Sequence, residues 1–189
     1  MTPDITTPDL LSRLRADTGA DHRKLDQHRL LATLTADPSR DEYRIAMTGL
    51  ARGWCPLEEA LEHSLAGSPW QPWLLPRRDA LMADLEDLGA TPPVDPAPIP
   101  AWSPEEAVGV LYTVKGAQLG SAFLERRLAA SDAGLPLAFF RCREDNWPAF
   151  CQQLRSLPPA MAPSASRGAR FAFRYLLTGL ESDSLGHDS

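Results

Sequence analysis

The amino-acid sequence predicts an all-α fold, a single domain built as a bundle of helices. Apolar residues recur at steps of three and four along most of the chain, and no segment shows the alternation of a half-buried strand. The 189 residues are enough for one sizeable core and few for two. A hydrophobic share of 43% and a charged share of 23% are ordinary for a globular protein.

The first predicted helix begins near the N-terminus. Thr7 is a plausible N-cap, Pro8 occupies a position where its missing N–H costs nothing, and Asp9 complements the helix dipole. The spacing then places five residues on one helical face: Leu11, Leu14, Thr18, His22 and Leu25. A histidine therefore lies on the same face as the leucines of this helix.

The second predicted helix begins at a capping box formed by Ser39 and Glu42. Its apolar face continues to Leu61, and we expect Pro56 to bend or break the helix near Gly53.

A shorter helix is expected over residues 76–88, with Gly89 as its C-terminal stop. The segment 91–101 contains five prolines and reads as an extended connector. We interpret it as a loop within one domain, because the helices before it are too few to close a core.

The strongest helix start combines Ser103, Pro104 and Glu106 as cap, first-turn proline and capping-box glutamate. This helix should run to about Ala130. Two further helices are expected over 147–157 and 164–181. The single domain is thus predicted to cover residues 1–189, with its core at about 8–181 and a frayed tail at 182–189.

Composition and charge exclude several classes of protein. A net charge of −6 argues against nucleic acid as the main partner. No apolar run is long enough to span a bilayer, and the N-terminal segment lacks the basic and apolar regions of a secretion signal, so a cytoplasmic location with no membrane contact is expected. The spacing of the cysteines favours free thiols over disulfides or a zinc site: Cys55, Cys142 and Cys151.

Three glycines interrupt the helix that starts at Ser103. Gly109, Gly116 and Gly120 share one helical face, and each costs about 1 kcal/mol relative to alanine. Either this face packs closely on a neighbouring helix, or a flat ligand lies against the exposed backbone.

His22 also allows two interpretations. A histidine on an apolar face is more often a core residue than a ligand. However, Asp26 lies one turn further on and could orient the imidazole for metal binding. The remaining histidines have weaker cases, and the paired Glu-x-x-His motifs of a di-iron bundle are missing.

Two segments resemble motifs of a known family. In Leu14–Asp26, the residues Thr18, His22 and Asp26 follow one another at intervals of four, which resembles the proximal helix of haem oxygenases. The segment Leu111–Ser121 resembles their glycine-bearing distal helix. It is most similar to the bacterial, bacteriophytochrome-associated branch, whose pattern is Leu-Tyr-Val-Leu-Glu-Gly-Ser-Thr-Leu-Gly-Gly. The resemblance extends over about residues 10–180.

This resemblance implies a haem oxygenase-like helical bundle and an oxidoreductase. Haem would be both cofactor and substrate, and O2 with a reductant would convert it to biliverdin, ferrous iron and carbon monoxide. The electrons would come from a ferredoxin or an NADPH-dependent flavin reductase. A bacteriophytochrome is a candidate acceptor of the biliverdin.

The resemblance also implies roles for individual residues on the first helix. His22 would be the proximal ligand of the haem iron, with Thr18 and Asp26 shaping the pocket around it. Arg15 matches a basic residue that meets a haem propionate, although it could equally be a solvated surface arginine.

On the distal side, Gly116 and Gly120 would let the helix backbone lie almost on the porphyrin and direct O2 to one meso carbon. Tyr112 would be among the residues that contact the haem. Ser121 would either donate a hydrogen bond to distal water or restrict the pocket.

Three departures from the family pattern leave an alternative open. Ala117 stands where some members carry an aspartate, Lys115 replaces a glutamate, and Ser121 replaces the last glycine. These changes favour, as a second hypothesis, a non-catalytic haem-binding or sensor protein on the same fold. A thiaminase-like hydrolase would need a nucleophilic cysteine beside paired carboxylates, which we do not identify, and a plain helical scaffold would bind no haem.

Overall fold

The computed structural model describes residues 8–91 and 98–181, and within these ranges it contains helices and no strand. The all-α prediction is confirmed. In chain order the helices are α1 (Leu10–Asp26), α2 (Arg29–Thr33), α3 (Arg40–Leu65), α4 (Arg78–Asp87), α5 (Pro104–Ala129), α6 (Ala138–Arg141), α7 (Trp147–Arg155) and α8 (Ala162–Glu181). Two 3-10 turns, η1 (Gln71–Trp73) and η2 (Pro159–Met161), lie in the connections.

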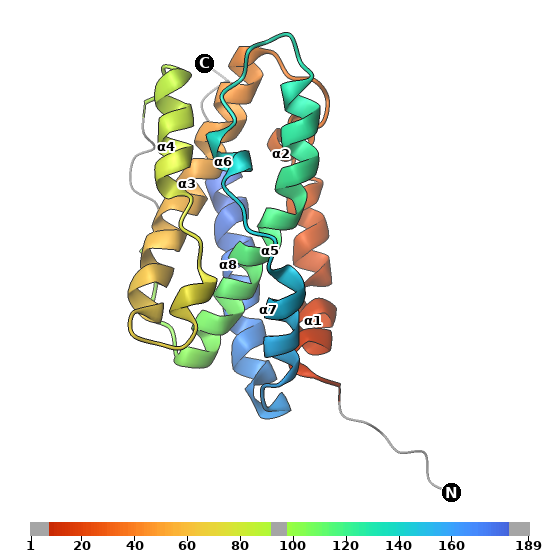
Figure 1. Cartoon of the computed structure of the whole chain (residues 1–189), viewed down its shortest axis with the longest axis vertical. Helices are drawn as coiled ribbons and strands as arrows, with labels where there is room; N and C mark the ends of the chain where they lie inside the picture. The colour runs from red at the N-terminus through yellow and green to blue at the C-terminus, as the bar shows by residue number, and fades with distance from the viewer. Residues whose placement is uncertain (1–7, 92–97, 182–189) are drawn as a thin grey trace, which may run out of the picture.

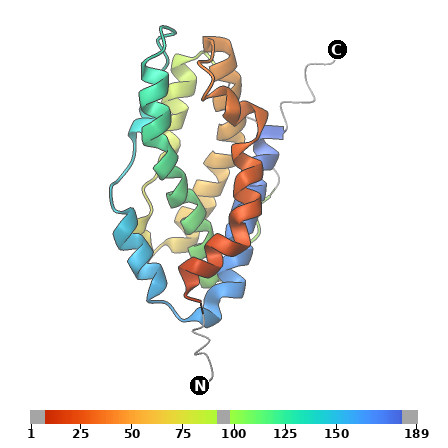
Figure 2. The same ribbon diagram turned by 90° about the vertical axis from the view of Figure 1, so that its right-hand side faces the viewer.

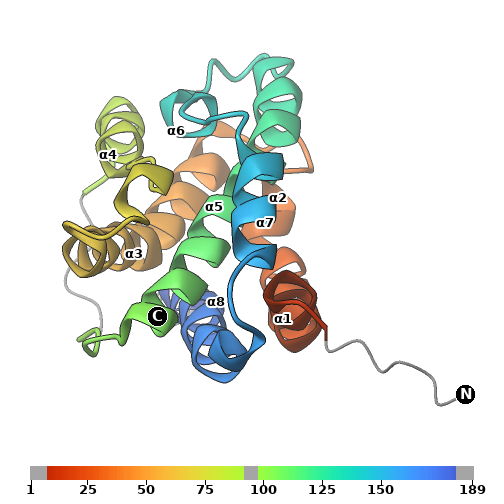
Figure 3. The same ribbon diagram turned by 60° about the horizontal axis from the view of Figure 1, so that its bottom comes forward.

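Helix α8 is the element that holds the bundle together. Helices α1, α3 and α5 all pack against it, α4 lies beside α3, and α7 lies beside α1 (Figures 1 and 3). The core between these helices is mostly leucine and alanine, and it also holds large aromatic side chains: Tyr43, Trp54, Phe139, Phe140 and Phe150.

Helices α5 and α8 approach so closely that neither could carry a side chain at the crossing. A Cβ atom on Gly109 would lie 1.8 Å from the carbonyl oxygen of Ala165, and one on Gly168 would lie 2.0 Å from that of Glu106. The first glycine of the predicted glycine face therefore serves helix packing.

Pro56 was predicted to bend or break the second helix, and the break does not occur. Helix α3 runs without interruption from Arg40 to Leu65, with Pro56 inside it. A proline removes only one main-chain hydrogen bond, and packing against α8 holds the helix on both sides of it. At this contact Gly53 meets Gly179 of α8, where a Cβ atom on Gly179 would lie 2.6 Å from the nitrogen of Gly53.

Most of the predicted helix boundaries are confirmed. Capping boxes are formed by Ser39 with Glu42 and by Ser103 with Glu106. Gly89, which follows the last turn of α4, has a φ of +63°, a value that favours glycine.

The first helix begins later than predicted. Its N-cap is Asp9, whose carboxylate accepts a hydrogen bond of 2.7 Å from the main-chain nitrogen of Ser12. The expected cap, Thr7, lies outside the described residues, as do residues 92–97 of the proline-rich connector and the predicted tail at 182–189.

Helices α2 and α6 were not predicted, because five and four residues are too few to show a hydrophobic period. The second of them is held by a buried carboxylate. Asp84 accepts hydrogen bonds from the main-chain nitrogens of Ala138 (2.8 Å) and Phe139 (2.9 Å), at the start of α6.

The structure also bears on the predictions for the cysteines and for membrane-spanning helices. All three cysteines are free thiols, as predicted. Over the described ranges, no helix has both the length and the apolar character needed to cross a membrane.

Candidate functional site

His22 lies near the end of α1 with 59% of its side chain exposed. Its Nδ1 is 2.7 Å from a carboxylate oxygen of Asp26, and its ring meets that of Phe173 on α8 edge-on, with 5.5 Å between centroids. An imidazole that donates its Nδ1 hydrogen to a carboxylate presents Nε2 as the free nitrogen. His22 is therefore an oriented, accessible imidazole and not a core residue.

The helix that carries His22 is fixed to α8 by polar contacts. Asp17 accepts a 2.7 Å hydrogen bond from the hydroxyl of Ser166. One turn later, Asp21 lies 3.2 Å from Arg170 and 3.9 Å from Arg174. These contacts set the position of α1 just before the turn that ends in His22.

Three of the residues singled out in the sequence meet where α1 approaches α5. Thr18 is buried, and its hydroxyl donates to the carbonyl oxygen of Leu14 at 2.7 Å. Burial raises the pKa of Tyr112 on α5, while hydrogen bonding to Thr18 and the charge of Arg15 act against that rise. Figure 2 shows α1 in red and α5 in green on the same side of the bundle, converging toward the end at which the chain begins.

The two later glycines of α5 have surroundings unlike those of Gly109. A Cβ atom on Gly116 would meet the ring of Trp147 at 3.6 Å, and one on Gly120 would have no atom within 4 Å. Beside Gly120, Leu119 is 56% exposed and Phe123 is 54% exposed. In the described part of the chain, these two are the large hydrophobic side chains left mostly exposed. Bare backbone and apolar side chains thus share one stretch of helix.

Ser121 points into the bundle. It is 2% exposed, its hydroxyl donates to the carbonyl oxygen of Ala117 at 3.3 Å, and it accepts a 3.0 Å hydrogen bond from Nη1 of Arg77. Its hydroxyl is therefore engaged on the buried side of α5, and the role expected for it toward a bound ligand stays a prediction.

Lys115, one of the three departures from the pattern that the sequence resembles, is a buried cation. Its Nζ lies 3.4 Å from a carboxylate oxygen of Glu144 and within 6 Å of the ring centroids of Trp73 and Phe150. The pair ties α5 to the loop between α6 and α7. Ala117, by contrast, is exposed and offers only a methyl group.

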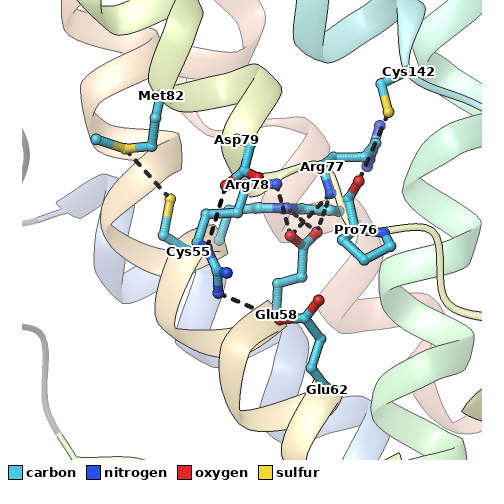
Figure 4. Close-up of polar contacts among 10 residues, drawn as sticks. Cys55, Glu58, Glu62, Pro76, Arg77, Arg78, Asp79, Met82 and Cys142 are labelled. Carbon is cyan, nitrogen blue, oxygen red and sulfur yellow. Dashed lines mark hydrogen bonds and ion pairs between the residues drawn. The ribbon is translucent and has the colours of Figure 1, made fainter.

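A second buried polar cluster was not predicted. The carboxylate of Glu58 accepts hydrogen bonds from Nε1 of Trp54 (2.8 Å) and from the main-chain nitrogens of Arg77 (2.9 Å) and Arg78 (2.7 Å) (Figure 4). Burial raises the pKa of Glu58 and lowers that of Arg77 to about 10. No sequence signal identifies this arginine, because adjacent arginines are ordinarily exposed.

His22 offers one imidazole nitrogen as a metal ligand, which suits a metal that receives its other ligands from a cofactor. Among residues 8–91 and 98–181, no three His, Cys, Asp or Glu side chains are grouped closely enough to hold a metal ion. A protein-only zinc site needs three or four such ligands, whereas a porphyrin supplies four nitrogens and needs one axial imidazole. A single oriented histidine on α1 therefore fits haem, and the apolar, side-chain-free stretch of α5 offers a surface that a flat macrocycle can cover.

The sequence matches no protein-family model and no curated protein. The structure is similar to that of the haem oxygenase from Neisseria meningitidis, solved with NO and CO bound, with a TM-score of 0.72, 25% identity, and coverage of 96% of this chain and 95% of that one. It is also similar to the haem oxygenase from Leptospira interrogans, with a TM-score of 0.69, 17% identity, and coverage of 93% and 100%. For haem oxygenase-1 from the cyanobacterium Synechocystis, in complex with haem, the TM-score is 0.64, the identity 18%, and the coverage 93% and 92%. The chain has the fold of the haem oxygenases.

Proposed function

We propose that the chain is a haem oxygenase of the bacterial, bacteriophytochrome-associated kind. The observation that carries the proposal is that a fold shared with haem oxygenases holds both an oriented imidazole on α1 and bare backbone on α5. In the proposal these two features lie on opposite faces of the haem. Haem would bind through His22 and be opened, with O2 and a reductant, to biliverdin, ferrous iron and carbon monoxide.

On the proximal side, Asp26 and Phe173 define what His22 can do. The carboxylate holds the Nδ1 hydrogen, and the ring edge of Phe173 limits rotation of the imidazole. Nε2 then remains as the nitrogen that binds iron, and the hydrogen bond to Asp26 makes it a stronger donor.

On the distal side, the missing side chain of Gly120 leaves room for a flat macrocycle. Leu119 and Phe123 offer apolar surface that a bound porphyrin would cover. Removal of such surface from water contributes about 25 cal/mol per Å², so this stretch of α5 favours a large apolar ligand.

The polar edge of the ligand would lie where α1 and α5 meet. A guanidinium binds a carboxylate with two parallel hydrogen bonds, so Arg15 is suited to a haem propionate. Tyr112, whose pKa the charge of Arg15 acts to lower, would contact the same part of the haem.

Bound haem would supply the redox-active iron and would itself be the substrate. In the proposal, electrons would come from a ferredoxin or an NADPH-dependent flavin reductase. We propose the cytoplasm as the compartment and a bacteriophytochrome as the acceptor of biliverdin.

The second candidate function is a haem-binding or sensor protein without ring-opening activity. Two observations favour it. Ala117 presents a methyl group where some family members carry an aspartate, and Lys115 is engaged with Glu144 inside the structure. This candidate shares the haem site and differs only in the chemistry that follows.

Titration with haemin tests the site. We expect one equivalent to give a histidine-ligated Soret spectrum, and His22→Ala to abolish this ligation. The matched control is His63→Ala, because His63 is also exposed and its Nδ1 is hydrogen-bonded to a main-chain oxygen of its own helix. A spectrum unchanged in His22→Ala would contradict the assignment.

Addition of a reductant in air separates the two candidate functions. Loss of the Soret band with growth of biliverdin absorption and release of carbon monoxide indicates the oxygenase. A persistent ferrous haem spectrum indicates the non-catalytic binder.

A further inference from the structure

Arg77 is a cation buried in the core at the start of α4, with 1% of its surface exposed. Its guanidinium carbon lies 4.4 Å from the ring centroid of Trp54 and 4.3 Å from that of Phe139. The two rings meet each other edge-on, with 5.2 Å between centroids, and the guanidinium lies over both of them. Attraction of the cation to the ring faces stabilises its charge.

The guanidinium has one hydrogen-bond acceptor, the hydroxyl of Ser121 at 3.0 Å from Nη1. Nε and Nη2 have no hydrogen-bond partner in the described part of the chain. Glu58 accepts from the main-chain nitrogen of Arg77 instead (Figure 4). The bond to Ser121 is thus the direct polar link between Arg77 and α5.

Ser121 connects Arg77 to the turn of α5 that contains Gly120. Its hydroxyl donates to the carbonyl oxygen of Ala117, four residues earlier. Hydrogen bonds of this kind bend helices locally. The bond from Arg77 fixes the orientation of the hydroxyl, so the cation and the serine together constrain the turn that contains Gly120 and follows Gly116.

We propose that Arg77 is a positioning residue: through Ser121 it fixes the Gly116–Gly120 turn of α5 and places a positive charge behind it. This inference rests on the proposed function, because that turn is the proposed distal wall of the haem site. The serine that replaces the family's last glycine is therefore the acceptor that this buried arginine requires.

The first experiment uses the haem-free protein and so does not depend on haem binding. Urea unfolding of wild type, Arg77→Met, Ser121→Ala and the double variant forms a double-mutant cycle. We expect the two substitutions to be coupled by about fivefold in the unfolding equilibrium constant. A parallel cycle with Arg78→Met is the control, because Arg78 pairs with Glu62, 3.4 Å away, and should show no coupling to Ser121.

The second experiment measures azide binding to the ferric haem-loaded protein. Loss of a nearby positive charge should weaken anion binding, so Arg77→Met is expected to lower azide affinity about fivefold. Arg77→Lys should restore most of it, and Arg78→Met should leave it unchanged. Ser121→Gly keeps the charge but removes the link, and should lower the affinity by about twofold.

Additive stability effects together with unchanged azide affinity would overturn the proposal and leave Arg77 as a packing residue. If Arg77→Met does not fold, Ser121→Gly decides: unchanged azide affinity in that variant would also overturn it. Failure of the wild type to bind haem would instead contradict the proposed function, while the haem-free cycle would still report on the link between Arg77 and Ser121.

Discussion

The two halves of α5 carry glycines on the same helical face, but the neighbours of these glycines differ. In the first half, Gly109 lies directly against the backbone of α8, and no side chain could be inserted. Further along the helix, a Cβ atom on Gly116 would meet the ring of Trp147, and one on Gly120 would meet nothing within 4 Å. One glycine thus serves packing, and another leaves a side-chain-free surface.

The difference shows that glycine spacing cannot be interpreted from one helix alone. Gly109 has a counterpart on α8, Gly168, and the two glycines together allow the crossing. Gly120 has no such counterpart and lies among exposed apolar side chains. Each glycine lowers helix stability relative to alanine. Close packing on α8 offsets this cost at Gly109, and in our proposal ligand binding offsets it at Gly120.

The largest effect is expected for Gly109→Ala. The new Cβ atom would overlap the carbonyl oxygen of Ala165, so the two helices must separate, and the free energy of unfolding should fall by about 3 kcal/mol. Urea denaturation followed by circular dichroism measures it. Gly19→Ala on α1 is the control, since its Cβ atom meets only the far end of a flexible arginine, and should be stabilising. Equal stability of the two variants would remove the distinction drawn here.

An intermediate effect is expected for Gly120→Leu. Open space around this position predicts no loss of stability and a gain of roughly 0.5 kcal/mol from helix propensity. The haem affinity, in contrast, should fall at least about tenfold, or 1.4 kcal/mol, because the leucine would occupy the proposed macrocycle surface. Haemin titration checks this, with Ala129→Leu, also exposed on α5, as the control. Undiminished affinity in Gly120→Leu would place the ligand elsewhere.

The smallest effect is expected for Phe123→Ser. Because this side chain is mostly exposed, the free energy of unfolding of the haem-free protein should change by no more than about 0.5 kcal/mol. Haem affinity should fall roughly threefold as apolar contact is lost. Parallel denaturation and titration of Arg126→Ser, its exposed neighbour in α5, gives the reference. A large loss of stability would show that Phe123 belongs to the core.

Local signals in the sequence predicted the fold well where chemistry acts within a few residues. The capping boxes at Ser39 and Ser103 and the stop at Gly89 form as expected, because each depends on hydrogen bonds or dihedral angles inside one turn. Pro56 does not break its helix, since the packing of α3 on α8 outweighs one lost hydrogen bond. Tertiary contacts decide such positions, and these contacts cannot be seen in a local pattern.

The candidate site could be predicted in part for the same reason. The pairing of His22 with Asp26 follows from an interval of four on one helix, and the structure contains it. The link between Arg77 and Ser121 joins residues 44 positions apart, and the burial of the arginine depends on rings from two other helices. Sequence spacing contains no information about such a contact.

The attachment of α1 is uneven along its length, and this has a consequence for its motion. Its first two turns bury Leu10, Leu11 and Leu14, whereas its last two turns are held by one partly buried leucine, Leu25, by the ion pairs of Asp21 and by the edge of Phe173. Amide hydrogens in the last turns should therefore exchange with solvent through small, local openings that leave the leucine-rich end in place. The rate at which haem reaches His22 should then follow these local openings of α1 and not the free energy of unfolding of the whole protein.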